Sequence, residues 1–189
     1  MTHTRKNRSA HNKTTKRIFT KTDYNSGDGM LTSVWGPAQW HFLHTMSFNY
    51  PNEPTKENKK HYRDFILNLE NTLPCKYCRI NLKKNFKTLP LKMELMKNRY
   101  TFSKYIYDLH EHINKMLNKK SGLSYEDVRE RYEHFRARCT KKPIIKIEKG
   151  CTESLYGEKS KCVIKIVPQS NKCKTFQMNR SCKKKRIKY

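Results

Sequence analysis

Residues 101–120, TFSKYIYDLHEHINKMLNKK, determine the predicted fold class. Large apolar side chains recur there at intervals of three and four residues, over more than four turns of one helix face. They are Phe102, Tyr105, Ile106, Leu109, Ile113, Met116 and Leu117. No alternation typical of a β-strand occurs between residues 35 and 139, so the elements that cover this apolar stripe are expected to be helices as well.

Four further helices are predicted around this segment. The first is expected to start at Gly36-Pro37, because a proline at the first helical position gives up no hydrogen bond. Its inner face carries Trp40, Leu43 and His44. The others are predicted after Pro54, from Leu73-Pro74-Cys75 to about Phe86, and from Ser124, with Asp127 completing a capping box. The fold class is therefore all-α, a small helical bundle.

The charge of the chain suggests a domain with polar arms. The 189 residues carry a net charge of +26, with a mean hydropathy of −1.01. We expect a basic disordered arm over residues 1–34, a helical domain over 35–139 and a basic, cysteine-containing tail over 140–189. No stretch approaches the roughly 20 apolar residues of a spanning helix, and none near the start resembles a secretory signal. Membrane insertion and secretion are therefore not expected, and a mitochondrial location is less favoured.

Cys75 and Cys78, in the stretch LPCKYC, form the chemical centre of the sequence. Pro74 places Cys75 at a predicted helix N-terminus, where unpaired N–H groups and the nearby Lys76 and Arg79 favour a thiolate. Two cysteines at this spacing suit dithiol–disulfide exchange. Three alternatives remain open: half of a zinc site, a thioredoxin-like motif, which needs a βαβ setting, and a purely structural pair.

Four stretches together resemble the Erv/ALR family of FAD-linked sulfhydryl oxidases, from residue 35 to about 139. They are WGPAQWHFLH at 35–44, YP at 50–51, LPCKYC at 73–78 and HEHINKMLNK at 110–119. Each is weak alone, but their order and spacing make the resemblance specific. The opening WGP is most similar to the versions encoded by large DNA viruses. The resemblance implies a four-helix bundle with a short fifth helix, FAD as cofactor, and a homodimer.

The resemblance also implies roles for individual residues. Cys78 would face the flavin and Cys75 would exchange with the incoming protein dithiol, so that two electrons pass to FAD and on to O₂, giving hydrogen peroxide. The matched cofactor-binding positions are Gly36, Trp40, His44, Tyr50, His110, Asn114, Lys119 and Lys120. Plain core packing is the alternative for Trp40 and Tyr50, and a solvated helix end for the two lysines. Glu111 replaces the family's asparagine and receives no role. No metal site is expected.

The predicted function is an FAD-dependent sulfhydryl oxidase that acts on protein dithiols or on a thioredoxin-like carrier, in the host cytoplasm or the virion. The alternative is a basic binding protein whose cysteine pair is structural or holds zinc. Five cysteines remain, Cys139, Cys151, Cys162, Cys173 and Cys182, and no two of them form a second Cys-x-x-Cys. Four alternatives stay open for them: a wider-spaced shuttle pair, a tail disulfide, a metal knuckle and free thiols. The basic run at 183–186 suggests weak, nonspecific, salt-dependent binding of polyanions, or simply a solvated tail.

Overall fold

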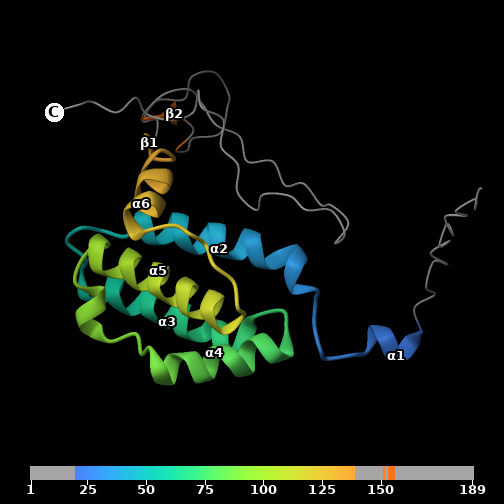
Figure 1. Ribbon diagram of the computed structural model, residues 1–189. Coiled ribbons are helices and arrows are strands. Elements are labelled where there is room, and N and C mark those ends of the chain that lie inside the picture. The colour runs from blue at the N-terminus through green and yellow to red at the C-terminus, as the bar shows by residue number, and fades with distance from the viewer. Residues whose placement is uncertain (1–19, 139–150, 152, 156–189) are drawn as a thin grey trace, which may run out of the picture.

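The computed structural model describes residues 20–138, 151 and 153–155, and most of them are helical (Figure 1). The elements in chain order are α1 (Lys21–Tyr24), α2 (Thr32–Phe48), α3 (Lys56–Thr72), α4 (Lys76–Thr88), the 3₁₀ helix η1 (Met93–Met96), α5 (Arg99–Met116), α6 (Tyr125–Glu133), β1 (Ala137–Arg138) and β2 (Glu153–Ser154). The all-α prediction is confirmed, with two very short strands added.

Four long helices form the bundle. Figure 1 shows α2, α3, α4 and α5 running lengthwise past one another, while α6 crosses one end. Helix α2 packs along α5, α3 packs along α4, and α6 contacts both α2 and α5. The fold is thus a four-helix bundle with a short additional helix, as the resemblance implied.

Local sequence explains where these helices begin. Thr55, Asn98 and Ser124 each accept a hydrogen bond from the backbone N–H three residues later, and each forms a capping box. The predicted box at Ser124 and Asp127 is confirmed. Helix α4 is different, because its N-cap is Cys75, whose sulfur takes the place of a capping hydroxyl. The chemical centre of the sequence is therefore also a helix terminus.

The predicted start of the first bundle helix is wrong by more than a turn. Helix α2 begins at Thr32, with Pro37 inside it. Pro37 has no N–H to donate to the Ser33 carbonyl, so the helix loses one hydrogen bond. The helix accommodates this loss in its second turn. The predicted boundary between residues 34 and 35 consequently falls inside a helix, and the helical domain includes Thr32.

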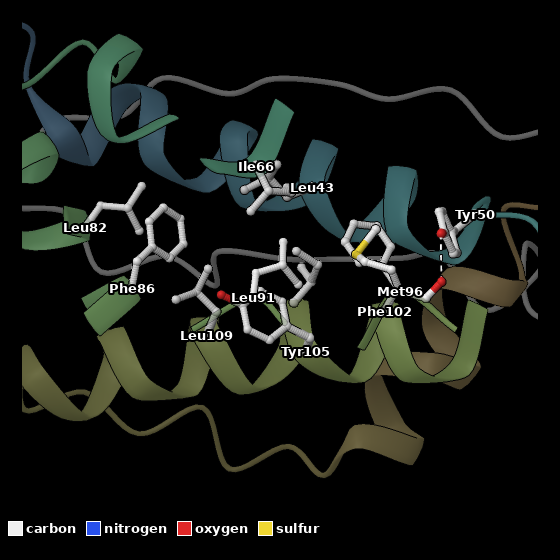
Figure 2. Close-up of a cluster of buried hydrophobic side chains, with 11 residues drawn as sticks. Leu43, Tyr50, Ile66, Leu82, Phe86, Leu91, Met96, Phe102, Tyr105 and Leu109 are labelled. Carbon is white, nitrogen blue, oxygen red and sulfur yellow. Dashed lines mark hydrogen bonds between the residues drawn. The ribbon is translucent and has the colours of Figure 1, made fainter. Parts of the chain in front are cut away.

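The main core lies between the four long helices and η1, as the close-up in Figure 2 shows. Its buried members are Leu43, Tyr50, Ile66, Leu82, Phe86, Leu91, Met96, Phe102, Tyr105, Ile106 and Leu109. A second small cluster of Phe48, Tyr125 and Val128 seals α6 against the end of α2. This packing fixes the relative positions of α2, α4 and α5, the helices that carry or adjoin the predicted site residues.

Part of the predicted tail contacts the end of the helical domain. Ala137 pairs with Ser154 and Arg138 with Glu153 in an antiparallel ladder, and the Leu155 N–H donates to the Arg136 carbonyl at 2.9 Å. The β-like run at 163–167 lies outside the described residues. Among the residues that the structure describes, no helix is long and apolar enough to cross a membrane.

Candidate active site

Cys75 and Cys78 form a disulfide at the N-terminus of α4. Their Cα atoms are 5.1 Å apart, and the Cys78 N–H donates to the Cys75 sulfur at 3.1 Å. Both residues are half-buried, so an incoming thiol can approach the pair. The predicted redox pair is therefore joined in the structure, in an orientation that lets a helix-terminal N–H stabilise charge on Cys75.

Basic side chains add to the positive potential at this helix end. Lys76 follows Cys75 directly and lies 3.6 Å from the carboxylate of Asp28. Arg79, one turn into α4, donates to the carbonyl of Leu73 just ahead of the pair. These charges, together with the unpaired N–H groups of the first turn, favour the thiolate over the thiol when the disulfide is reduced.

The segment that leads into α2, residues 28–32, lies against the cysteine pair. The Met30 N–H donates to the Pro74 carbonyl at 2.6 Å, and the Lys76 N–H donates to the Asp28 carbonyl at 2.8 Å. Gly29 thereby forms an antiparallel bridge with Cys75. At the end of this segment Thr32, the first residue of α2, contacts the sulfur of Cys78. We call residues 28–32 the strap.

Trp40, His44 and His110 form a second group, on α2 and α5. Nε2 of His44 lies 3.0 Å from Nδ1 of His110, and the rings of Trp40 and His110 stack with centroids 3.9 Å apart. Trp40 is eight residues beyond Thr32, or about 12 Å along α2. One helix thus carries both a contact to the redox pair and the aromatic group.

Burial keeps both histidines uncharged. It lowers the pKa of His44 to about 3, helped by the positive charges that His110 and His41 would carry. Burial also lowers the pKa of His110 to about 4, with Lys119 adding to the effect and Glu111 opposing it. At neutral pH each ring therefore has one donor and one acceptor nitrogen, which suits hydrogen bonds to a heterocyclic ligand.

An unsatisfied atom shows that this group fits an aromatic cofactor. Nδ1 of His44 is buried and has no hydrogen-bond partner in the described structure, although buried polar atoms are nearly always paired. A neutral imidazole nitrogen beside the face of Trp40 offers both a polar contact and a stacking surface, and flavin and adenine rings use both. The donor set therefore fits FAD, the cofactor that the family resemblance implied.

Four other predicted cofactor residues lie at or near α5 and in α2: Lys119, Lys120, Asn114 and Gly36. Lys119 lies close enough to His110 to lower its pKa, and Lys120 is exposed next to it. The Asn114 side chain donates to Glu111 at 2.9 Å, so Glu111 orients Asn114. Gly36 is buried in α2. A Cβ added at Gly36 would make only an ordinary contact with the Thr32 side chain. Packing within the chain therefore does not require glycine at this position.

Tyr50 does not join this group. It is fully buried in the main core, and its hydroxyl donates to the Met96 carbonyl at 2.9 Å (Figure 2). Its ring packs against Tyr62 and Phe102. With no exposed surface and a satisfied hydroxyl, Tyr50 packs in the core as the alternative for it described, and its contact with the cofactor stays a prediction.

Sequence reasoning missed several residues of the site. Asp28, Gly29 and Thr32 belong to no motif, and only the tertiary fold brings them to the cysteine pair. Tyr132 on α6 stacks on His44, with centroids 5.1 Å apart, and its hydroxyl lies 3.2 Å from Nδ1 of His41. No motif in the sequence indicates that Tyr132 lies against His44.

The described residues contain no cluster of three histidine, cysteine or acidic side chains that could hold a metal ion. The sulfurs of Cys75 and Cys78 are bonded to each other instead. Of the remaining cysteines, Cys151 is also disulfide-bonded. The calls on Cys139, Cys162, Cys173 and Cys182, and on the basic run at 183–186, lie outside the described residues.

Comparison with known proteins places this site in a family. The sequence model of the Erv1 / Alr family matches residues 37–141. A probable FAD-linked sulfhydryl oxidase of Acanthamoeba polyphaga mimivirus is 34% identical over 104 residues, covering 55% of this chain and 72% of that protein. The FAD-linked sulfhydryl oxidase of African swine fever virus (isolate Pig/Kenya/KEN-50/1950) is 30% identical over 99 residues, 52% of this chain and 80% of that protein.

Solved structures agree at the level of the fold. The yeast Erv1 core superposes with a TM-score of 0.50 at 20% identity, covering 65% of this chain and 96% of that one. The FAD binding domain of Erv1 from Saccharomyces cerevisiae gives the same TM-score at 21% identity, covering 55% and 94%. The helical bundle of this chain thus has the same fold as these proteins.

Proposed function

Because this chain belongs to the Erv1 / Alr family, we propose that it is an FAD-dependent sulfhydryl oxidase that forms disulfide bonds in protein thiols. The observation that carries the proposal is the Cys75–Cys78 disulfide at the N-terminus of α4. The same chain has two neutral histidines beside Trp40: His110 stacks on its ring, and His44 lies tilted to it.

The chain's own residues carry out the thiol exchange. A substrate thiolate attacks the sulfur of Cys75, the Cys75–Cys78 bond breaks, and Cys78 leaves as a thiolate. The second substrate thiol then attacks the mixed disulfide, which releases the oxidised substrate and the Cys75 thiolate. Two electrons have now entered the pair, and the helix-terminal N–H of Cys78 and the charges of Lys76 and Arg79 stabilise the thiolates.

Trp40, His44 and His110 would hold the aromatic rings of FAD, and Lys119 and Lys120 would meet its diphosphate. Bound FAD supplies the two-electron acceptor that reoxidises the pair and passes the electrons to O₂, with hydrogen peroxide as the product. The buried Nδ1 of His44 supports the assignment, because a ligand would give this atom the partner it lacks.

We also propose a homodimer formed through the outer faces of α2 and α3. Phe42 and Phe65 are 52% and 41% exposed and contact each other edge-on. Two large exposed rings on adjacent helices are typical of an interaction surface rather than of a solvated face. Sedimentation of the wild-type chain and of Phe42→Ser/Phe65→Ser would separate dimer from monomer; a wild-type monomer refutes this part.

Three further proposals are a division of the chain into an N-terminal arm that ends before Thr32, a helical domain and a basic tail, a thioredoxin-like carrier as substrate, and a location in the host cytoplasm or virion. The relatives of large DNA viruses support the location. The charge of the tail supports a role in recruiting acidic partners, since residues 140–189 carry fifteen basic and three acidic side chains.

The flavin spectrum and the cysteine pair test the proposed activity together. The purified chain should be yellow, and a small dithiol should bleach the flavin absorbance of the wild-type protein in the absence of oxygen. Cys78→Ser should keep the flavin but lose the bleaching, whereas the tail variant Cys173→Ser serves as the matched control and should behave like wild type. A colourless protein, or bleaching of Cys78→Ser at the wild-type rate, would contradict the proposal.

A further inference from the structure

The strap, residues 28–32, contacts the cysteine pair although it lies outside the four motif stretches. Its two backbone hydrogen bonds reach the residues on both sides of Cys75, and the Asp28–Lys76 ion pair adds a side-chain contact. The turn that presents Cys75 is therefore fixed by the strap as well as by α4.

Gly29 makes this close approach possible. Its φ is +110°, and a Cβ built on it would lie 2.5 Å from the Pro74 carbonyl oxygen and 2.7 Å from the Cys75 Cα. Both neighbours are backbone atoms that cannot rotate away. Any larger residue would lift the strap from the pair. Gly27, two residues earlier, has open space around it, so glycine is required at one position and not at the other.

The strap ends by bringing a hydroxyl to the second cysteine. The Thr32 Oγ1 lies 3.6 Å from the Cys78 sulfur, within hydrogen-bond range for sulfur. Cys75 has its own donor, the Cys78 N–H at 3.1 Å, while Thr32 is the side-chain donor that the structure places at Cys78. Each sulfur of the pair thus has a separate hydrogen-bond donor.

We propose that Thr32 is a positioning residue that stabilises the Cys78 thiolate, and that the strap anchored by Gly29 holds it in place. The inference rests on the proposed exchange at the cysteine pair. When a substrate thiolate bonds to Cys75, the electron pair of the broken S–S bond passes to Cys78. The Thr32 O–H then donates to that sulfur, and a better-stabilised leaving thiolate departs faster.

Other charges near the pair do not replace this hydroxyl. Lys76 and Arg79 lie on α4 itself, and Asp28 lies on the strap, where it pairs with Lys76. Residues 31–39, the strap end and first half of α2, carry no charged side chain. Thr32 is the α2 residue whose hydroxyl contacts the Cys78 sulfur.

The test is the pH dependence of Cys78 alkylation in the full FAD-loaded chain. In a Cys75→Ser background, iodoacetamide labelling of the peptide that contains Cys78 is followed by mass spectrometry between pH 5 and 9. Thr32→Val should raise the pKa of Cys78 by about one unit, the size expected for loss of one hydrogen bond to a charged group at a partly exposed site. Thr32→Ser should restore the wild-type value.

Gly29→Ala tests the strap with a matched control. It should raise the pKa as Thr32→Val does, the two changes together should not add, and Gly27→Ala should leave the pKa unchanged. An unaltered Cys78 pKa in Thr32→Val, or in Gly29→Ala should Thr32→Val not fold, overturns the inference. Because alkylation does not require turnover, oxygen uptake by the wild-type chain reports separately on the proposed oxidase activity.

Discussion

Lowering the pH should unfold this protein through His44 and His110. Both have folded-state pKa values, about 3 and about 4, that lie below the 6.5 of an exposed histidine. Between pH 4 and 6.5 the unfolded chain therefore binds more protons than the folded chain. The stability that the neutral rings contribute is complete above pH 6.5 and is lost as the pH falls toward the folded values.

The size of the effect follows from the same shifts. At pH 5 an unfolded histidine is almost fully protonated while the buried one is not, which costs about 2 kcal/mol for each ring relative to pH 7. The two rings together give about 4 kcal/mol, a large part of the 5–15 kcal/mol that stabilises a typical domain. Their 3.0 Å contact requires an acceptor nitrogen, so protonation of both rings also breaks the hydrogen bond between them.

Urea unfolding at pH 7, 6 and 5 measures this loss directly. The free energy of unfolding of the wild-type chain should fall steeply over the range, and that of His44→Gln/His110→Gln should start lower and fall by about 4 kcal/mol less. His61→Gln changes an exposed histidine on α3 and should follow the wild-type slope. Equal slopes in the wild-type chain and the double variant would refute the reasoning.

Three further expectations concern the core and the tail. Phe102→Ala removes a fully buried ring and should lower the free energy of unfolding by about 3–5 kcal/mol in urea titrations; a loss near zero would contradict the packing. Tyr50→Phe leaves the Met96 carbonyl without its donor and should cost about 1 kcal/mol while the FAD content measured by absorbance stays unchanged; lost FAD would restore Tyr50 to the cofactor site. Truncation after Thr140 removes β2 but should leave oxidation of a small dithiol at the wild-type rate, and a collapse of that rate would place the tail in the catalytic domain.

Local signals explain which parts of the fold could be predicted from the sequence. The capping box at Ser124 and the apolar stripe of α5 depend on residues three and four apart. The box is confirmed, and so is the stripe from Phe102 to Leu109, but its predicted end, Met116 and Leu117, is exposed. The start of α2 was predicted wrongly. The helix tolerates the hydrogen bond lost at Pro37, and its first residue is set by the strap, whose contacts with residues 74–76 are not visible in the sequence.

The site divides in the same way. The pairing of Cys75 with Cys78 follows from their spacing. The family resemblance assigned His44 and His110 to one cofactor site, but it did not predict the direct contact between them. Gly29 and Thr32 contact residues more than forty positions away, and no periodicity in either segment indicates that contact. Tyr50 is a different case, because the family resemblance gives it a cofactor contact while the structure buries it in the core.

The balance of oxygen, thiol and peroxide tests the central claim most directly. The purified chain with FAD bound is mixed with a small dithiol in air-saturated buffer, and oxygen consumed, thiol lost and peroxide formed are measured in the same sample. We predict that each disulfide formed consumes one O₂ and yields one H₂O₂, and that Cys78→Ser shows none of the three. Thiol loss without matching peroxide, or undiminished turnover by Cys78→Ser, would contradict oxidation through this cysteine pair.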